Sequence, residues 1–89
     1  MHVKSDWPVS LSVSAADGQT CVEACLVMPG GGRLVGHGQA RRHPADRLDV
    51  RIGAEIATAR AISDLAWQLW QVAAAAIEDN TREQALLYP

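Results

Sequence analysis

The sequence contains no phenylalanine, and its aromatic side chains amount to 4% of the residues. A core without phenylalanine has to be built from aliphatic and small side chains, so we expect thin, closely packed layers. No apolar run approaches the roughly 18 residues that a membrane-spanning helix needs. The first residues, MHVKSDWP, lack the apolar segment of a secretory signal. These absences predict a cytoplasmic protein with no membrane contact.

Cysteine is also scarce, because two residues are too few for a disulfide framework. With two histidines they give the spacing Cys21-x3-Cys25-x11-His37-x5-His43, which is close to that of a zinc finger. A zinc finger places its histidines on a helix, whereas glycines and a proline flank these histidines and favour strand and turn. On a strand, Cys21 and Cys25 would lie about 13 Å apart, too far for a shared zinc or a disulfide. We expect no cofactor, no metal and two free thiols.

The sequence lacks the excess of positive charge that is typical of nucleic-acid-binding proteins, because its formal net charge is −2. The charge is uneven, since residues 33–60 contain six arginines against three acidic residues and the remainder is acidic. Any contact with a phosphate backbone would therefore be limited to a local basic patch. A solvated, arginine-rich turn is the other interpretation of the same pattern.

Motifs for catalysis are absent, because the chain has neither a nucleophile elbow with a Ser–His–Asp set nor HExxH. The glycines at 30–32 precede no helix start and no lysine-serine pair, so a hairpin loop is expected there rather than a phosphate site. A general base is one interpretation of His37 and His43. A structural role is the more common one for a lone histidine. The sequence predicts no enzymatic activity and no small-molecule substrate.

Three segments alternate with the period of two that is typical of β-strands. They cover about residues 7–14, 20–28 and 33–41. In the first, apolar side chains alternate with serines, which predicts a strand with one solvated face. Asp17-Gly18 is a hairpin signal, and the proline and glycines of residues 29–32 turn the chain again. The pattern predicts a three-stranded antiparallel sheet.

The longest periodic segment follows these strands and has the period of a helix. One apolar row recurs at alternating steps of four and three residues: Ile52, Ile56, Ala59, Ser63, Ala66, Trp70, Ala73 and Ile77. A second row consists of Ile62, Leu65, Leu69, Val72 and Ala76. Together the rows cover about 200° of the helix, whereas an ordinary surface helix needs about 100°. A narrow polar strip remains at Arg60, Asp64, Gln68, Gln71 and Glu78. This helix needs apolar cover on two sides.

Glycines in the third predicted strand indicate where the helix approaches the sheet. Glycine weakens a strand unless another segment comes close. Gly36 and Gly38 would permit such contact, and the small residues of the first helical row are expected to supply it. The sequence therefore predicts one α+β domain over residues 1–89, a three-stranded antiparallel sheet followed by one long C-terminal helix. The connector is expected over 42–51, the helix over about 53–79 and an apolar tail over 80–89.

The predicted helix is longer than the predicted sheet. Its ~26 residues span about 39 Å, whereas strands of about eight residues span about 26 Å. The overhang and the tail are too apolar for free exposure to water, so we expect a homodimer. The expected dimer contacts are Trp67, Trp70, Val72, Ile77, Leu86, Leu87 and Tyr88.

Two linked motifs carry a family resemblance. They are LVGHGQARRHPAD at residues 34–46 and IGAEIATARAISDL at residues 52–65, and Leu86-Leu87-Tyr88 is similar to the family's tail. The chain resembles, over about residues 20–88, a family of small actinobacterial proteins classed as a domain of unknown function. Some members are associated with dormancy and low-oxygen stress. The resemblance implies a β-β-β-α fold, a dimer, and a shape similar to ribosome hibernation promoting factors and double-stranded-RNA-binding domains.

The chain departs from this family on the second strand and on the helix. Members tend to carry basic residues on the outward face of that strand, where this chain has Cys21, Glu23 and Cys25. Trp67 and Trp70 replace smaller or polar residues. These departures weaken the case for RNA binding through the sheet and favour a protein partner.

Two functions remain open at this stage, and neither is enzymatic. The first is a stress- or dormancy-linked factor that associates with ribosomes or structured RNA. Its phosphate contacts would be the arginines around the connector: Arg41, Arg42, Arg47 and Arg51. The second is a dimeric protein-interaction module with no nucleic-acid contact. The dependence of binding on salt would separate them, because phosphate contacts release counterions.

Overall fold

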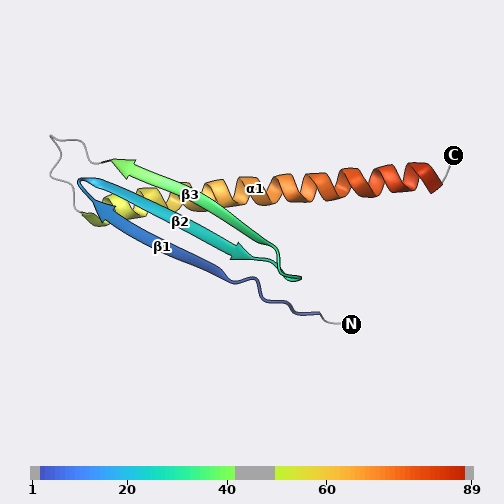
Figure 1. Cartoon of the computed structure of the whole chain (residues 1–89), viewed down its shortest axis with the longest axis horizontal. Helices are drawn as coiled ribbons and strands as arrows, with labels where there is room; N and C mark the ends of the chain where they lie inside the picture. Colours follow the sequence, from blue (N-terminus) through green and yellow to red (C-terminus); the bar gives the residue numbers. More distant parts are fainter. Residues whose placement is uncertain (1–2, 42–49, 88–89) are drawn as a thin grey trace.

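The computed structural model describes residues 3–41 and 50–87. Three strands, β1 (Val9–Ala16), β2 (Gln19–Val27) and β3 (Arg33–Arg41), precede one helix, α1 (Val50–Leu87). Neighbouring strands are antiparallel, and their order in the sheet is β1-β2-β3. The helix crosses one face of this sheet and continues far beyond it (Figure 1). The predicted fold class, an antiparallel sheet followed by one long C-terminal helix, is confirmed.

Both hairpin turns form where the turn residues predict them. Asp17 and Gly18 have φ values of 53° and 76°, the left-handed pair that a two-residue turn requires. In the second turn the Met28 N–H donates to the Gly32 carbonyl at 2.7 Å. Gly30 and Gly31 have φ values of 96° and 101°, which only glycine adopts without strain.

The ends of two elements differ from the predicted bounds. β1 covers Val9–Ala16 rather than 7–14, because Ala15 and Ala16 still pair with β2. The helix covers Val50–Leu87 rather than 53–79, so the predicted tail is helical through residue 87. Thr81 donates its hydroxyl to the Ile77 carbonyl at 2.9 Å. Arg82 lies 3.4 Å from the Glu78 carboxylate, one turn earlier, and such pairs extend a helix past polar residues.

The core lies where α1 crosses β2 and β3. Six apolar residues form the buried cluster there: Val22, Ala24, Leu26, Ala57, Ala61 and Leu65. Gly36 permits this contact, since a Cβ built on it would lie 2.6 Å from the Leu65 amide nitrogen and 2.8 Å from the Leu65 Cβ. A Cβ on Gly38 would collide with the backbone of Ala57 and Ala61. The predicted close approach at the two glycines is therefore confirmed.

The helical row that makes this contact is not the predicted one. Ala59, Ser63 and Ala66, which we expected against the glycines, are exposed. Ala57, Ala61 and Leu65 take their place, at steps of four residues. Because apolar residues surround more than half of the helix, periodicity alone does not choose between its faces. The sheet chooses the row without bulky side chains near the glycines, since the row with Ile52, Ile56 and Trp70 would not fit.

The apolar face of β1 receives little cover from the helix. Val9, Leu11 and Val13 are paired with Leu26, Ala24 and Val22 of β2 and therefore point to the helix side. Even so, about half of each β1 side chain is exposed, at 53%, 47% and 50%. α1 lies over β2 and β3 and leaves this side of the sheet open (Figure 1).

Candidate functional site

Side chains of α1 seal the outer edge of β3. Arg60 donates to the Gln39 carbonyl at 2.7 Å, the Asp64 carboxylate accepts from the His37 N–H at 2.8 Å, and Gln68 donates to the Val35 carbonyl at 2.8 Å. Gln68 also lies 3.3 Å from Asp64. The helix thus supplies the partners that a further strand would supply.

The spacing of helix and strand explains this arrangement. Four helical residues rise about 6 Å, and two strand residues rise about 6.6 Å. A polar side chain every fourth helical residue therefore meets every second residue of the strand beside it. The polar strip predicted from Arg60, Asp64 and Gln68 is present, but these side chains lie on the strand edge and are not simply solvated. The sequence does contain a signal for this edge contact. Polar residues recur at steps of four in the helix, and the preceding strand contains glycines that permit the helix to come close.

The opposite edge of the sheet is open. The Pro8 carbonyl accepts from the Val27 N–H at 3.0 Å, so even-numbered β1 residues bond to β2. The backbone groups of Val9, Leu11 and Val13 point away from the sheet. Among the described residues, no strand or side chain occupies that edge. β1 also lacks charged residues over Val9–Ala16, which are the usual means of protecting an exposed edge.

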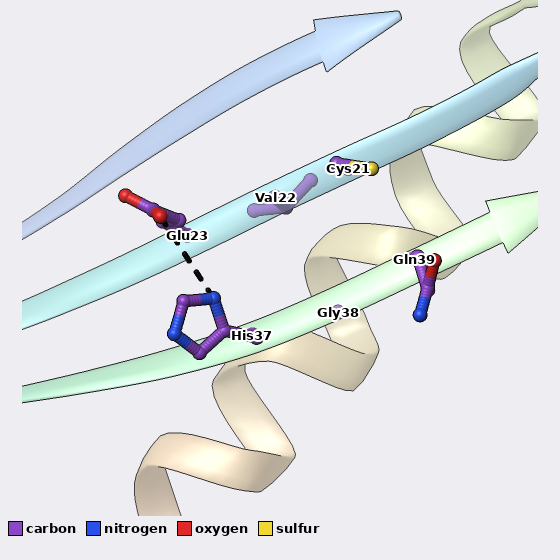
Figure 2. Close-up of a pocket in the computed structure, with 6 residues that line it drawn as sticks. All are labelled: Cys21, Val22, Glu23, His37, Gly38 and Gln39. Carbon is purple, nitrogen blue, oxygen red and sulfur yellow. Dashed lines mark ion pairs between the residues drawn. The ribbon is translucent and has the colours of Figure 1, made fainter.

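A shallow depression of about 210 Å³ lies on the sheet face opposite the helix (Figure 2). Cys21 and Glu23 of β2 and His37 and Gln39 of β3 line it, with Val22 and Gly38. His37 Nδ1 lies 3.9 Å from the Glu23 carboxylate, and both side chains are about two-thirds exposed at 65% and 64%. The pair is a cross-strand surface contact, and the depression holds no buried polar group that would position a substrate.

The two cysteines lie on one strand, as predicted. Cys21 is exposed, Cys25 is half-buried, and both are free thiols. Within residues 3–41 and 50–87, no cluster of three metal-ligating side chains is found. His43, the remaining member of the zinc-finger-like spacing, lies outside the described residues. The absence of a metal stays a prediction.

The predicted phosphate-contacting arginines are only partly described. Arg41 is the last residue of β3 and is exposed. Arg51 lies in the first turn of α1 and is exposed. The end of β3 and the start of α1 lie at the same end of the molecule, at the left in Figure 1. Arg42 and Arg47 lie outside the described residues. The structure therefore brings Arg41 and Arg51 to one end of the molecule.

The predicted dimer contacts do not share one side of α1. Trp67, Trp70 and Ile77 are 63%, 72% and 66% exposed, and they lie within about 80° of one another around the helix. Val72 is 42% exposed but lies about 160° from Trp70 at 100° per residue. Leu86 and Leu87 are in the last turn, where side chains are not described, and Tyr88 is outside the described residues.

A mainly apolar surface, with one serine at its middle, runs along the side of α1 that faces away from the sheet. We call it the outward stripe; it consists of Ile52, Ile56, Ala59, Ser63, Ala66, Trp70, Ala73 and Ile77. All eight residues are exposed. None of its members is charged, and the exposed carboxylate of Glu55 borders it near its first residues. Contiguous exposed apolar surfaces of this kind mark sites of interaction.

The helix α1, over Val50–Leu87, bears on membrane insertion only through its length and apolar character. No helix in the described part of the chain combines the length and the apolar character that crossing a bilayer requires. The outward stripe is apolar on one side only, since Arg60, Asp64 and Gln68 occupy another side of the same helix.

The family model and the similar proteins point to the same family. The model of the Rv2632c-like family matches residues 5–86. The chain is 41% identical to the uncharacterized protein Mb1767 of Mycobacterium bovis, over 98% of this chain and 93% of that protein. It is 38% identical to the uncharacterized protein Rv2632c of Mycobacterium tuberculosis, over 92% of this chain and 87% of that protein.

A solved structure agrees with the fold. The crystal structure of Rv2632c superposes with a TM-score of 0.82 at 39% identity, over 90% of this chain and 94% of that chain. The names of the relatives assign no activity to them. Sequence and structure together establish that this chain belongs to the Rv2632c-like family.

Proposed function

We propose that the protein is a non-enzymatic homodimer that serves as a protein-interaction module. The observation that supports this most is the outward stripe of α1, because eight consecutive positions of one helical face are left in water. The buried apolar residues in the described part of the chain are, by contrast, small or aliphatic, as are Ala57, Ala61 and Leu65 of α1. Burying apolar area releases about 25 cal/mol per Å², so a second apolar surface on this stripe would be stabilising.

Light scattering on the untagged protein tests this function. We expect a mass of twice 9.5 kDa at micromolar concentration, with dissociation on dilution. A mass of one chain over the whole concentration range would contradict the proposal. Because apolar contacts are little affected by screening, raising the salt concentration should leave the dimer intact.

A second candidate function is association with ribosomes or structured RNA during stress or dormancy. It is supported by Arg41 and Arg51 at one end of the molecule and by the resemblance to dormancy-associated proteins. Two observations weigh against it. Arg60 is engaged at the β3 edge, and Arg33 begins β3 while Arg41 ends it, so the positive segment does not form one patch.

Sedimentation with ribosomal particles at increasing salt tests the second function. If phosphate contacts exist, binding should fall steeply between about 50 and 200 mM salt. Replacing Arg42 and Arg47 with Ala should then weaken binding and flatten the salt dependence. Binding that is absent at every salt concentration would eliminate this candidate and leave the interaction module.

A further inference from the structure

We propose that two copies of the chain pair through their outward stripes as an antiparallel coiled coil, with the two-fold axis between residues 64 and 65. This rests on the proposed function and goes further, because it names the surface, the direction and the register of the pair. The partner is a second copy of this chain, and each α1 then lies between its own sheet and the other helix.

The first argument is the spacing of the stripe. Its residues follow one another at steps of four and three over Ile52–Ile77, which is the a/d pattern of a coiled coil. Sustained over more than three heptads, that pattern predicts a helix-to-helix seam. In this molecule α1 contacts its own sheet through a different row, Ala57, Ala61 and Leu65. The seam is therefore complete and faces water.

The second argument is the size of facing side chains. In an antiparallel pair each a position faces a d position of the other helix. About the proposed axis, Trp70 faces Ala59, Ile56 faces Ala73, and Ser63 faces Ala66 of the second copy. A large side chain meets a small one in the first two layers, which gives even packing. A parallel pair would place Trp70 against Trp70 and Ala59 against Ala59, with crowding in one layer and a void in the other.

The third argument concerns the residues beside the seam. In the antiparallel register Ile62 lies near Leu69 of the second copy, and both are apolar. Trp67 of the second copy lies near the aliphatic stem of Arg60, whose guanidinium donates to the Gln39 carbonyl of its own chain. The register brings no two like charges together across the seam. It also accounts for Trp67, which is 63% exposed in one chain although it lies beside the stripe rather than in it.

The distance between two spin labels at residue 78 tests the direction. The label is attached to Glu78→Cys in a background with Cys21→Ser and Cys25→Ser, which removes the two native thiols. Antiparallel pairing places position 78 beside position 51 of the second copy, so the labels are separated by 27 residues, or about 40 Å. A parallel pair would place them only about 10–15 Å apart, close to the interaxial distance.

Two matched charge substitutions test the surface. Trp70→Glu places a carboxylate in the seam of both chains and should raise the dimer dissociation constant at least about 100-fold. Val72→Glu adds the same charge two residues away, on the other side of the same overhang, and should change the constant less than about threefold. Both residues are exposed, at 72% and 42%, so both variants should retain the circular dichroism of the wild type.

Each result decides between the proposals. A label distance near 40 Å with selective loss on Trp70→Glu supports the antiparallel seam. A dimer with labels about 10–15 Å apart, or one that Val72→Glu disrupts as much as Trp70→Glu does, overturns the seam and leaves the dimeric function standing. A wild-type protein that stays monomeric overturns both, and assigns the stripe to another protein or to a lipid surface.

Discussion

The two long faces of α1 are both apolar, but they differ in side-chain size and in what lies against them. The sheet face presents Ala57, Ala61 and Leu65 to a strand that contains two glycines, and all three are buried. The outward face presents Ile52, Ile56 and Trp70, whose exposed fractions are 41%, 41% and 72%. Close backbone contact, and not total hydrophobicity, therefore selects the face of α1 that packs against the sheet. The remaining face is available for a contact between chains.

The largest loss of stability is expected where the contact between α1 and β3 leaves no room for a side chain. Gly36→Val should destabilise the fold by about 3 kcal/mol or more, because its Cβ would meet the backbone of Leu65. Urea unfolding followed by circular dichroism measures this. Gly32→Ala is the matched control, since its Cβ would meet only the flexible end of Met28 at 2.9 Å. A Gly36→Val protein with the wild-type midpoint would contradict the close contact.

A pair of identical substitutions on opposite faces of α1 tests whether the two faces differ in packing. Ala61→Leu adds three carbons beneath Gly38 and should cost about 2 kcal/mol. Ala66→Leu adds the same carbons on the exposed face and should change the stability of the separate chain by no more than about 0.5 kcal/mol. Both are compared at concentrations low enough to dissociate a dimer. Equal losses in the two variants would mean that the faces do not differ.

The polar contacts beside the sheet face should have a smaller effect. Asp64→Ala removes the acceptor for the His37 N–H and should cost about 1–2 kcal/mol, since Asp64 is half-buried and partly screened. Asp64→Asn keeps an acceptor oxygen and should recover most of that loss. The free energy of unfolding, measured by urea titration, is compared between the two variants and the wild type. If the Ala and Asn variants were equally stable, the hydrogen bond would contribute nothing.

The smallest effect is expected far from both contacts. Glu78 and Arg82 lie 3.4 Å apart with 72% and 70% of their side chains exposed. Exposed pairs of this kind contribute at most about 0.5 kcal/mol, so Glu78→Gln should leave helix content and the unfolding midpoint nearly unchanged. A loss of helical signal comparable to that of Gly36→Val would show that the overhang depends on this pair.

The sequence predicts the order of the elements better than their contacts. Alternation and the Asp17-Gly18 turn are local properties, and both predicted hairpins are confirmed. The face of α1 is not a local property, because it depends on which row fits Gly36 and Gly38 in three dimensions. The role of Asp64 depends in the same way on the strand that happens to lie beside it. The predicted helix ends at residue 79 because Asp79 and Asn80 are weak helix formers. In the structure, α1 continues through both residues to Leu87.

Hydrogen exchange should divide α1 into two units, although it is one continuous helix. Up to Leu69 its amides lie over the sheet, and they can exchange only when that packing is lost. Beyond Leu69 every residue up to Arg82 is exposed, and a helix without tertiary packing is only marginally stable in water. Its amides should exchange through local opening, orders of magnitude faster. A second chain seated on the stripe would slow exchange as far as Ile77 and leave the last turns fast, so the boundary of protection would map the partner's reach residue by residue.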